Sequence, residues 1–161
     1  MWVYYMIFLL SLSSCSLDFY NNSKVKRILY TLLSVFLIFI VGCRAVGIDN
    51  DSEMYIAAFE RLQNTYERSE KFFELGYVAI IKLIIFFEGK ASVQFIIFAV
   101  ITGISNYLFF YKKSYFPFLS LFLYLSLFWI QRDFNQIRFS LCCSIVFWAI
   151  YFFNINKFSS V

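Results

Sequence analysis

Residues 28–41 read ILYTLLSVFLIFIV, and residues 42–62 continue as GCRAVGIDNDSEMYIAAFERL. The first run contains no charged side chain, and with flanking residues it is just long enough to cross the core of a bilayer as a helix. Directly after it the chain carries an arginine, then aspartates and a glutamate. We therefore predict a membrane-spanning helix whose end meets water at a cluster of charged side chains.

The composition of the whole chain indicates the same class of protein. Its 161 residues are 61% hydrophobic and 24% aromatic. A soluble domain of this size cannot hide so much apolar surface, and an unusually apolar soluble bundle is the alternative. Histidine is absent, so proton transfer would fall to carboxylate, lysine or tyrosine side chains. There is no nucleotide-binding glycine loop, metal triad or basic nucleic-acid patch, and we predict no cofactor, no metal and no nucleic-acid partner.

Apolar segments recur along the chain. They cover approximately residues 2–17, 28–43, 75–87, 92–111, 115–131 and 137–154. We predict an all-α, polytopic membrane protein with about five to six transmembrane helices, forming one domain over residues 1–161. The first segment resembles a signal peptide, but it has no basic start and a second apolar run follows soon after. Both features favour an uncleaved transmembrane helix.

Charges in the loops orient these helices. The loop DFYNNSKVKR carries Lys24, Lys26 and Arg27, which places it in the cytoplasm by the positive-inside rule. The next loop, residues 44–74, is then external, and it is rich in acidic residues.

A short helix is predicted inside this external loop. Asn50 and Glu53 resemble a capping box that would open a helix over about residues 51–62. Its apolar face consists of Met54, Tyr55, Ala58, Phe59 and Leu62. Because the helix is too short to span a bilayer, we predict that it lies along the membrane interface.

The topology depends on residues 75–87, which are apolar but short. If this segment crosses the bilayer, Lys112 and Lys113 lie outside, against the positive-inside rule. If it is re-entrant or only partly inserted, both lysines lie inside and Arg138 shares the outer face with Arg44. We favour the second arrangement.

Arg44 is the first candidate functional residue. As an isolated arginine it would serve as a membrane anchor that reaches the phosphate headgroups. Its context suggests more, because Gly47 allows a sharp turn, Asp49 follows in the same loop and Tyr55 lies one turn into the next helix. A guanidinium binds two phosphate oxygens at once, and a nearby carboxylate can accept a proton from a sugar hydroxyl.

A second group of candidates lies in WIQRDFNQIRFS, residues 129–140. If the chain is helical from Arg132 onward, Arg132 and Gln136 share a face. The alternative is a polar connecting loop. Arg138 argues against that alternative, because it lies inside the start of an apolar span, where a charge needs a partner. Glu74, which precedes the short apolar segment, could face the same pocket as Asp49.

The order and spacing of these residues resemble a known family. A transmembrane helix ends in R-x-x-G-x-D with a tyrosine soon after, E-x-G-Y opens a short apolar helix, and a polar junction ends in Q-I-R. The matching residues are Arg44, Gly47, Asp49, Tyr55, Glu74, Gly76, Tyr77, Gln136, Ile137 and Arg138. The chain resembles the EpsG-type, Wzy-type polymerases of bacterial O-antigen, capsule and exopolysaccharide. It departs from them at Phe139, where glutamine is common, and in length, which suggests an N-terminal portion that is incomplete at its C-terminus.

The resemblance implies an enzyme of the bacterial inner membrane that polymerises undecaprenyl-pyrophosphate-linked oligosaccharides on the outer face. Chain-length regulators and flippases would be its partners, and no cofactor is implied. Arg44 and Arg138 would bind the pyrophosphate with help from Arg132, and Gln136 and Tyr55 would hold sugar or phosphate oxygens. Asp49 or Glu74 would be the catalytic base.

Two alternatives from other classes remain at this stage. One is a membrane glycosyltransferase that uses a lipid-phosphate sugar and moves a single sugar. The other is an inactive truncated chain or a membrane scaffold that binds a partner through its aromatic faces.

Overall fold

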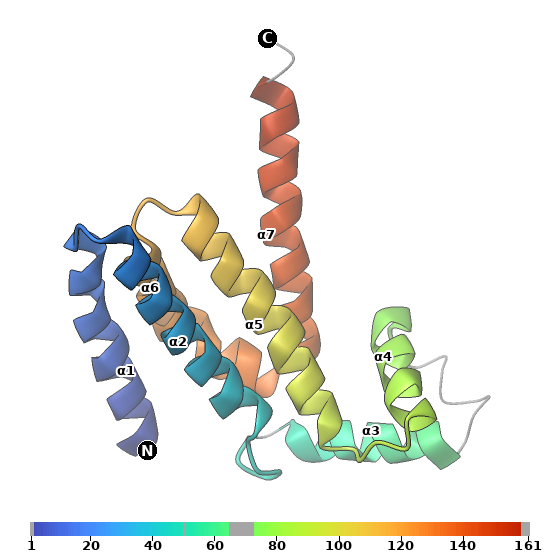
Figure 1. Ribbon diagram of the computed structural model, residues 1–161. Helices are drawn as coiled ribbons and strands as arrows, with labels where there is room; N and C mark the ends of the chain where they lie inside the picture. Colours follow the sequence, from blue (N-terminus) through green and yellow to red (C-terminus); the bar gives the residue numbers. More distant parts are fainter. Residues whose placement is uncertain (1, 50, 65–72, 159–161) are drawn as a thin grey trace.

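The computed structural model describes residues 2–49, 51–64 and 73–158 (Figure 1). The side chains of Val3, Ile130, Arg132 and residues 154–158 lie outside the described part. All regular structure in the described residues is helical, which confirms the predicted class. The elements are α1 (Trp2–Ser14), the 3₁₀ helix η1 (Cys15–Phe19), α2 (Ser23–Gly42), α3 (Ser52–Asn64), α4 (Leu75–Phe86), α5 (Val93–Lys113), α6 (Pro117–Tyr124), the π-helix η3 (Leu125–Asn135) and α7 (Ile137–Phe158).

Two of these helices, α2 and α5, are long and apolar enough to cross a membrane. Shorter apolar helices cover Tyr4–Phe19, Leu75–Phe86, Pro117–Trp129 and Ile137–Phe153. The predicted total of about five to six spans stays a prediction, because length and composition support only α2 and α5 directly.

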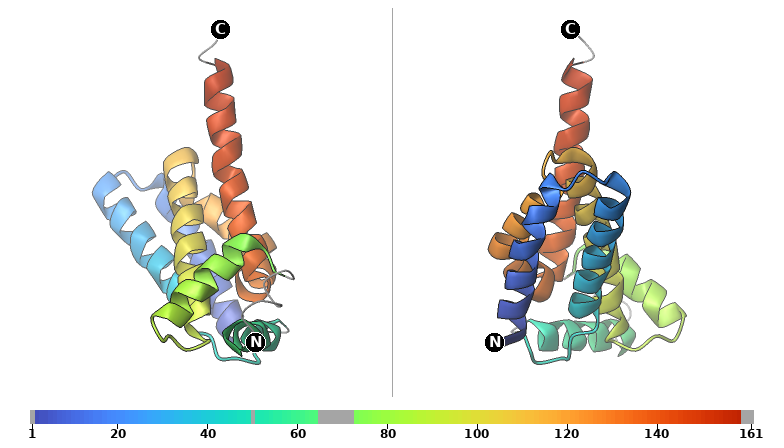
Figure 2. Two further views of the ribbon diagram at one scale, coloured as in Figure 1. Left: turned by 90° about the vertical axis from the view of Figure 1, so that its right-hand side faces the viewer. Right: turned by 60° about the vertical axis from the view of Figure 1, so that its left-hand side comes forward.

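The helices form a bundle with one helix lying across its end (Figures 1 and 2). α2 packs against α5, α5 against α7, and α1 against α6. α3 runs across the end at which α2 finishes and α5 and α7 begin; we call this the α3 end. α7 continues well past its neighbours toward the opposite end (Figure 2).

The start of α6 is held by a residue from far along the chain. Pro117 suits the first turn of a helix because it needs no N–H partner there. The Phe116 side chain at the N-cap cannot accept hydrogen bonds, and the buried Asp18 carboxylate replaces it. Asp18 accepts the backbone N–H groups of Phe118 at 3.2 Å and Leu119 at 2.8 Å. The α1–α2 connection therefore caps a helix that begins about a hundred residues later.

We expect Asp18→Ala to lower the free energy of unfolding by about 1–2 kcal/mol, because two backbone N–H groups, those of Phe118 and Leu119, lose their acceptor. Unfolding in mixed detergent micelles, followed by tryptophan fluorescence, measures the change. Asp18→Asn keeps an acceptor oxygen and should lose less. Equal stability of Asp18→Ala and the parent chain would contradict this role.

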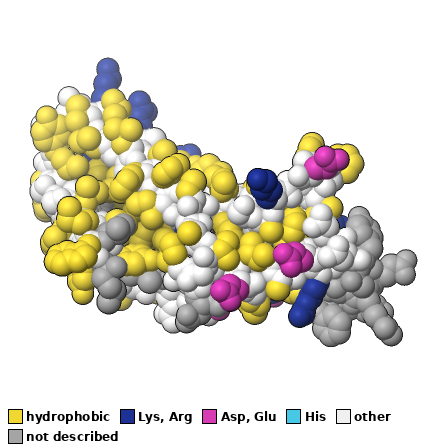
Figure 3. All heavy atoms as spheres, turned by 90° about the horizontal axis from the view of Figure 1, so that it is seen from below, with side chains coloured by type: hydrophobic (Ala, Val, Ile, Leu, Met, Phe, Trp, Pro, Cys, Tyr) yellow, Lys and Arg dark blue, Asp and Glu magenta, His cyan; other side chains and the backbone are white. Residues whose placement is uncertain are grey.

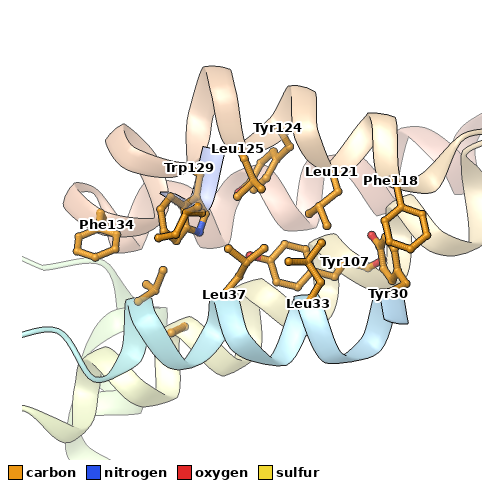
Figure 4. Close-up of a cluster of buried hydrophobic side chains, with 13 residues drawn as sticks. Tyr30, Leu33, Leu37, Tyr107, Phe118, Leu121, Tyr124, Leu125, Trp129 and Phe134 are labelled. Atoms are coloured by element: carbon orange, nitrogen blue, oxygen red, sulfur yellow. The ribbon is translucent and has the colours of Figure 1, made fainter. Parts of the chain in front are cut away.

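The main hydrophobic core lies between α2, α5, α6 and η3 (Figure 4). Leu33 and Leu37 of α2 face Leu121, Leu125 and Trp129 across it. Leu37 and Leu121 are fully buried, and α1 contributes Ile7. This core sets the position of the α6–η3 segment relative to α2.

A second core lies under α3 and brings α3, α4 and the start of α5 together. Its buried residues are Tyr55, Ala58, Phe59, Leu62, Tyr77, Val78, Ile81, Ile84, Phe95, Phe98 and Ile137. The helix predicted over about residues 51–62 is therefore confirmed as α3, although Asn50 of the predicted capping box lies outside the described residues. The predicted apolar face was wrong at Met54, which is 52% exposed, because the face turns toward α4 and α5.

α4 does not run from one end of the bundle to the other. Glu74 at its N-cap contacts Arg138 in the first turn of α7, and the turn after α4 leads directly into the start of α5 at the α3 end (Figures 1 and 2). α4 therefore runs only part of the way along the bundle from the α3 end, as in the partly inserted arrangement that the sequence favours. Lys112 and Lys113 then lie at the same end of the bundle as the start of α2, which we call the basic end.

Seen from below, toward the α3 end, hydrophobic side chains cover much of the surface on the side of α1 and α2 (Figure 3). The acidic side chains visible on this face lie toward α3 and α4. The acidic side chains of this face thus lie near the second core.

Candidate functional site

Arg44 lies just beyond the end of α2, inside the protein. Its Nη1 donates to the backbone carbonyl of Asp133 at 3.2 Å, and its Nη2 lies 3.5 Å from Oδ2 of Asp49. The guanidinium stacks over Phe95 at 4.5 Å and Phe134 at 5.4 Å. Only 1% of the Arg44 side chain is exposed. Burial lowers the pKa of Arg44, and the Asp49 carboxylate opposes part of this effect.

The turn that holds Asp49 is built from the first sequence motif. Gly47 has a φ of 89°, a backbone conformation that favours glycine. Its N–H donates to Oγ of the fully buried Ser52 at 2.8 Å, and Ser52 Oγ donates to the Asp49 carbonyl at 3.1 Å. These bonds fold the loop back so that the Asp49 carboxylate reaches Arg44.

Arg138 has a different environment. Its Nη1 lies 2.5 Å from Oε2 of Glu74, and its guanidinium lies 5.6 Å from the ring centre of Tyr55 and 5.5 Å from that of Tyr77. The Arg138 side chain is 30% exposed and that of Glu74 is 67% exposed. Both can therefore meet a ligand from solvent.

The ionisation of this group follows from its contacts. The pKa of Glu74 lies below its ordinary value chiefly because its own backbone N–H donates to the carboxylate. Burial opposes this lowering of the pKa, and Arg138 adds to it. Burial raises the pKa of Tyr55, although Arg138 opposes the rise. Glu74 is therefore ionised and Tyr55 neutral near pH 7.

Gln94 fixes the two tyrosines behind Arg138. It is fully buried in the first turn of α5, where its Oε1 accepts the Tyr77 hydroxyl at 2.9 Å. Its Nε2 donates to the backbone carbonyl of Tyr55 at 3.2 Å. One side chain thus ties α3, α4 and α5 together beneath the exposed arginine.

A pocket of about 510 Å³ at the α3 end is bordered by Tyr55, Tyr77, Glu74 and Arg138. Its polar side is formed by Asp51, Tyr55, Glu74, Gln136 and Arg138. Its other side is apolar and follows α7 through Phe139, Cys142 and Ile145. The pocket therefore combines charged side chains with an apolar wall along α7.

A model of the EpsG family matches residues 27–161. The chain belongs to the EpsG family. Neither the curated proteins nor the solved structures that were searched contain a match to this chain. Membership indicates a polymerase-type, glycosyltransferase-like role in polysaccharide biosynthesis, and together with the apolar helices it indicates a membrane protein.

The structure brings the three sequence motifs of this EpsG family member to one end. The second and third motifs meet directly through Glu74 and Arg138. The first motif lies beside them. The Phe95 ring, which lies against Arg44, packs against Tyr55 with 6.4 Å between the ring centres, and Arg138 lies over the same Tyr55 ring. Arg44 and Asp49 do not border the pocket, so the two arginines share an end of the bundle but not a cavity.

The junction before Arg138 differs from the expected helix. η3 ends at Asn135, and Gln136 has φ −103° and ψ 65°, so the helix that would place Arg132 and Gln136 on one face does not continue to Gln136. The break orients Gln136 and Arg138 toward the pocket. The predicted role of Arg132 stays untested, because its side chain lies outside the described residues.

A ring of hydrogen bonds that the sequence did not predict positions this junction in the EpsG family member. Asp133 Oδ1 accepts the hydroxyls of Tyr124 at 2.7 Å and Ser140. Asn106 donates to the Tyr124 hydroxyl at 2.8 Å and accepts from Ser144 at 2.8 Å. The ring joins α5, α6, η3 and α7, and it satisfies polar groups that lipid surroundings would leave without water.

Sequence reasoning noted Asp51 beside Asp49 and Tyr77 within a motif but assigned neither a role in the site, and it missed Gln94 altogether. Tyr77 belongs to the E-x-G-Y motif and Asp51 lies two residues beyond Asp49, so both carried a local signal. Gln94 carried none, because a glutamine at the start of an apolar helix is uninformative until its partners are known.

Proposed function

We propose that this chain polymerises undecaprenyl-pyrophosphate-linked oligosaccharide repeat units into a surface polysaccharide at the outer face of the bacterial inner membrane. The observation that carries the proposal is the pocket at the α3 end, which is lined by the partly exposed Arg138 and by an apolar wall along α7. A lipid-linked pyrophosphate has the same division into an anionic head and an apolar tail.

Arg138 is the residue that binds the pyrophosphate. Its planar guanidinium can meet two phosphate oxygens at once, and it is exposed on the pocket side. In the unbound protein Glu74 is its partner. An incoming diphosphate competes for the same N–H groups and frees the Glu74 carboxylate within the same pocket.

Glu74 then has the position of a general base. The acceptor sugar hydroxyl attacks the anomeric carbon of the growing chain, a new C–O bond forms, and the bond from that carbon to the pyrophosphate oxygen breaks. The hydroxyl proton passes to Glu74, and undecaprenyl pyrophosphate leaves with its charge held by Arg138. Tyr55 and Gln136 line the same pocket and can hold sugar or phosphate oxygens.

In this proposal Arg44 and Asp49 are positioning residues that do not contact the substrate. They tie the first motif to the carbonyl of Asp133, five residues before Arg138. Chain-length regulators and flippases are the proposed protein partners, since they would deliver substrate to the enzyme and release product from it.

The proposal is tested with a strain that lacks this gene, complemented by the parent chain, Glu74→Gln or Glu74→Asp. The parent should restore a ladder of long polysaccharide, Glu74→Gln should leave mainly single repeat units, and Glu74→Asp should restore part of the ladder. Restoration by Glu74→Gln at the parent level would overturn the role of Glu74.

The same gels separate the alternatives. A deletion strain whose single repeat unit lacks one sugar would indicate a transferase that moves one sugar. Unchanged polysaccharide in the deletion strain would overturn the polymerase proposal.

A further inference from the structure

A second pocket lies at the basic end, between α2 and α5, and the proposed reaction does not use it. Its volume is about 370 Å³. Arg27 and Lys112 border it, and farther along the helices its wall includes Ile38, Ile104 and Leu108. The pocket therefore combines two cations with a largely apolar groove. Arg27 lies near the start of α2 and Lys112 in the last turn of α5, which both belong to the basic end (Figure 1).

The two cations of this pocket differ from their neighbours. Lys26 donates to the Asp18 carbonyl at 2.7 Å, and Lys113 contacts the hydroxyl and ring of Tyr151. Within the described residues, no acidic side chain forms an ion pair with Arg27 or Lys112. Their charge is available to a ligand.

The backbone of α2 adds to this preference for an anion. The first turn of α2 holds no acidic residue, and its N-cap Asn22 accepts only the N–H groups of Lys24 and Val25. Cations near a helix N-terminus oppose the helix dipole, so an anion bound between Arg27 and Lys112 would relieve this repulsion.

The groove beyond the cations is apolar in effect. Three of its hydroxyl groups have backbone partners: Tyr30 donates to the Tyr107 carbonyl at 3.1 Å, Thr31 to the Arg27 carbonyl at 2.9 Å, and Ser34 to the Tyr30 carbonyl at 2.8 Å. The rest of the lining beyond the cations consists of aliphatic side chains and the rings of Tyr107 and Tyr111.

α2 and α5 touch beside the groove at Gly103 and Ile38. A Cβ placed on Gly103 would collide with the Ile38 side chain, so the absence of a side chain permits this contact. From there the groove runs toward Arg27 and Lys112.

We infer that this pocket binds an anionic phospholipid. The phosphate group lies between Arg27 and Lys112, and one acyl chain follows Ile38, Ile104 and Leu108. Free phosphate would leave the aliphatic groove exposed, and a zwitterionic headgroup would bring a positive charge toward two cations.

The test uses the full chain, purified in a neutral detergent, and measures the midpoint of thermal unfolding. Phosphatidylglycerol, phosphatidylcholine or inorganic phosphate is added. At a lipid concentration about 100 times Kd, phosphatidylglycerol should raise the midpoint by about 5–10 °C, and the other two should raise it little.

Variants locate the effect. Arg27→Gln and Lys112→Gln should each lose most of the shift caused by phosphatidylglycerol. Lys24→Gln is the matched control, because it removes one positive charge from the same turn of α2 but does not border the pocket, and it should keep the shift. Leu108→Trp fills the groove without changing charge and should also lose it.

The inference is overturned if phosphatidylcholine or inorganic phosphate stabilises the chain as much as phosphatidylglycerol does. It is also overturned if Lys24→Gln loses as much of the shift as Arg27→Gln, or if Leu108→Trp keeps it. Because Leu108 is 44% exposed, its replacement leaves the core intact and the test does not depend on the charge variants folding.

Discussion

Arg138→Ala should reduce polysaccharide polymerisation by about 100-fold or more while the protein stays folded. Removing a donor that stabilises developing charge costs about this much in enzymes. The side chain is 30% exposed and packs over Tyr55 and Tyr77, so its loss removes little buried contact. The length and amount of polysaccharide made by the complemented deletion strain measure the effect.

Two controls define the role of Arg138. Arg138→Lys keeps the charge but cannot meet two oxygens in one plane, so it should restore only part of the activity. Arg61→Ala removes a cation from the last turn of α3 and does not border the pocket, and it should leave polymerisation unchanged. Polymerisation at the parent level by Arg138→Ala would mean that another group binds the pyrophosphate.

Arg44→Ala should instead destabilise the fold and lower the free energy of unfolding by about 3–5 kcal/mol. Removing one partner leaves the Asp49 carboxylate without its counter-charge and the Asp133 carbonyl without this donor. It also opens a gap between Phe95 and Phe134. The midpoint of thermal unfolding and the yield of monodisperse protein in detergent measure the loss.

A paired replacement separates a structural role for Arg44 from contact with substrate. Arg44→Met combined with Asp49→Leu removes both charges and fills the volume with apolar atoms, which is often neutral or stabilising for a buried ion pair. We expect the double variant to fold and to retain polymerisation. A stable double variant without activity would show that one of the two residues touches the substrate.

Much of the fold was predictable because membrane helices carry strong local signals. The apolar runs that became α2 and α5 needed no tertiary information. The positive-inside rule favoured Lys112 and Lys113 at the end where α2 begins, and this grouping agrees with an α4 that does not cross. The short helix in residues 44–74 followed from its spacing of apolar residues, and only its orientation differed at Met54.

The site was predictable in part for the same reason. Tyr55, Glu74, Gln136 and Arg138 border one pocket, and all belong to motifs visible in the sequence. Arg44 and Asp49 also belong to a motif, but the sequence does not reveal whether an ion pair faces a ligand or a core. Their burial depends on the rings of Phe95 and Phe134, which come from distant segments.

The sequence by itself determined the apolar, lipid-facing character of the chain and the positions at which charged residues flank the helices. It also determined which residue types are available at each end of the bundle. Those properties depend on neighbours along the chain. Tertiary structure alone decided that Asp18 caps α6, that Asp133 joins Tyr124 and Ser140, and that Arg138 meets Glu74. Each of these contacts requires helices to pack at one relative position, and shape complementarity between side chains far apart in the chain selects that position.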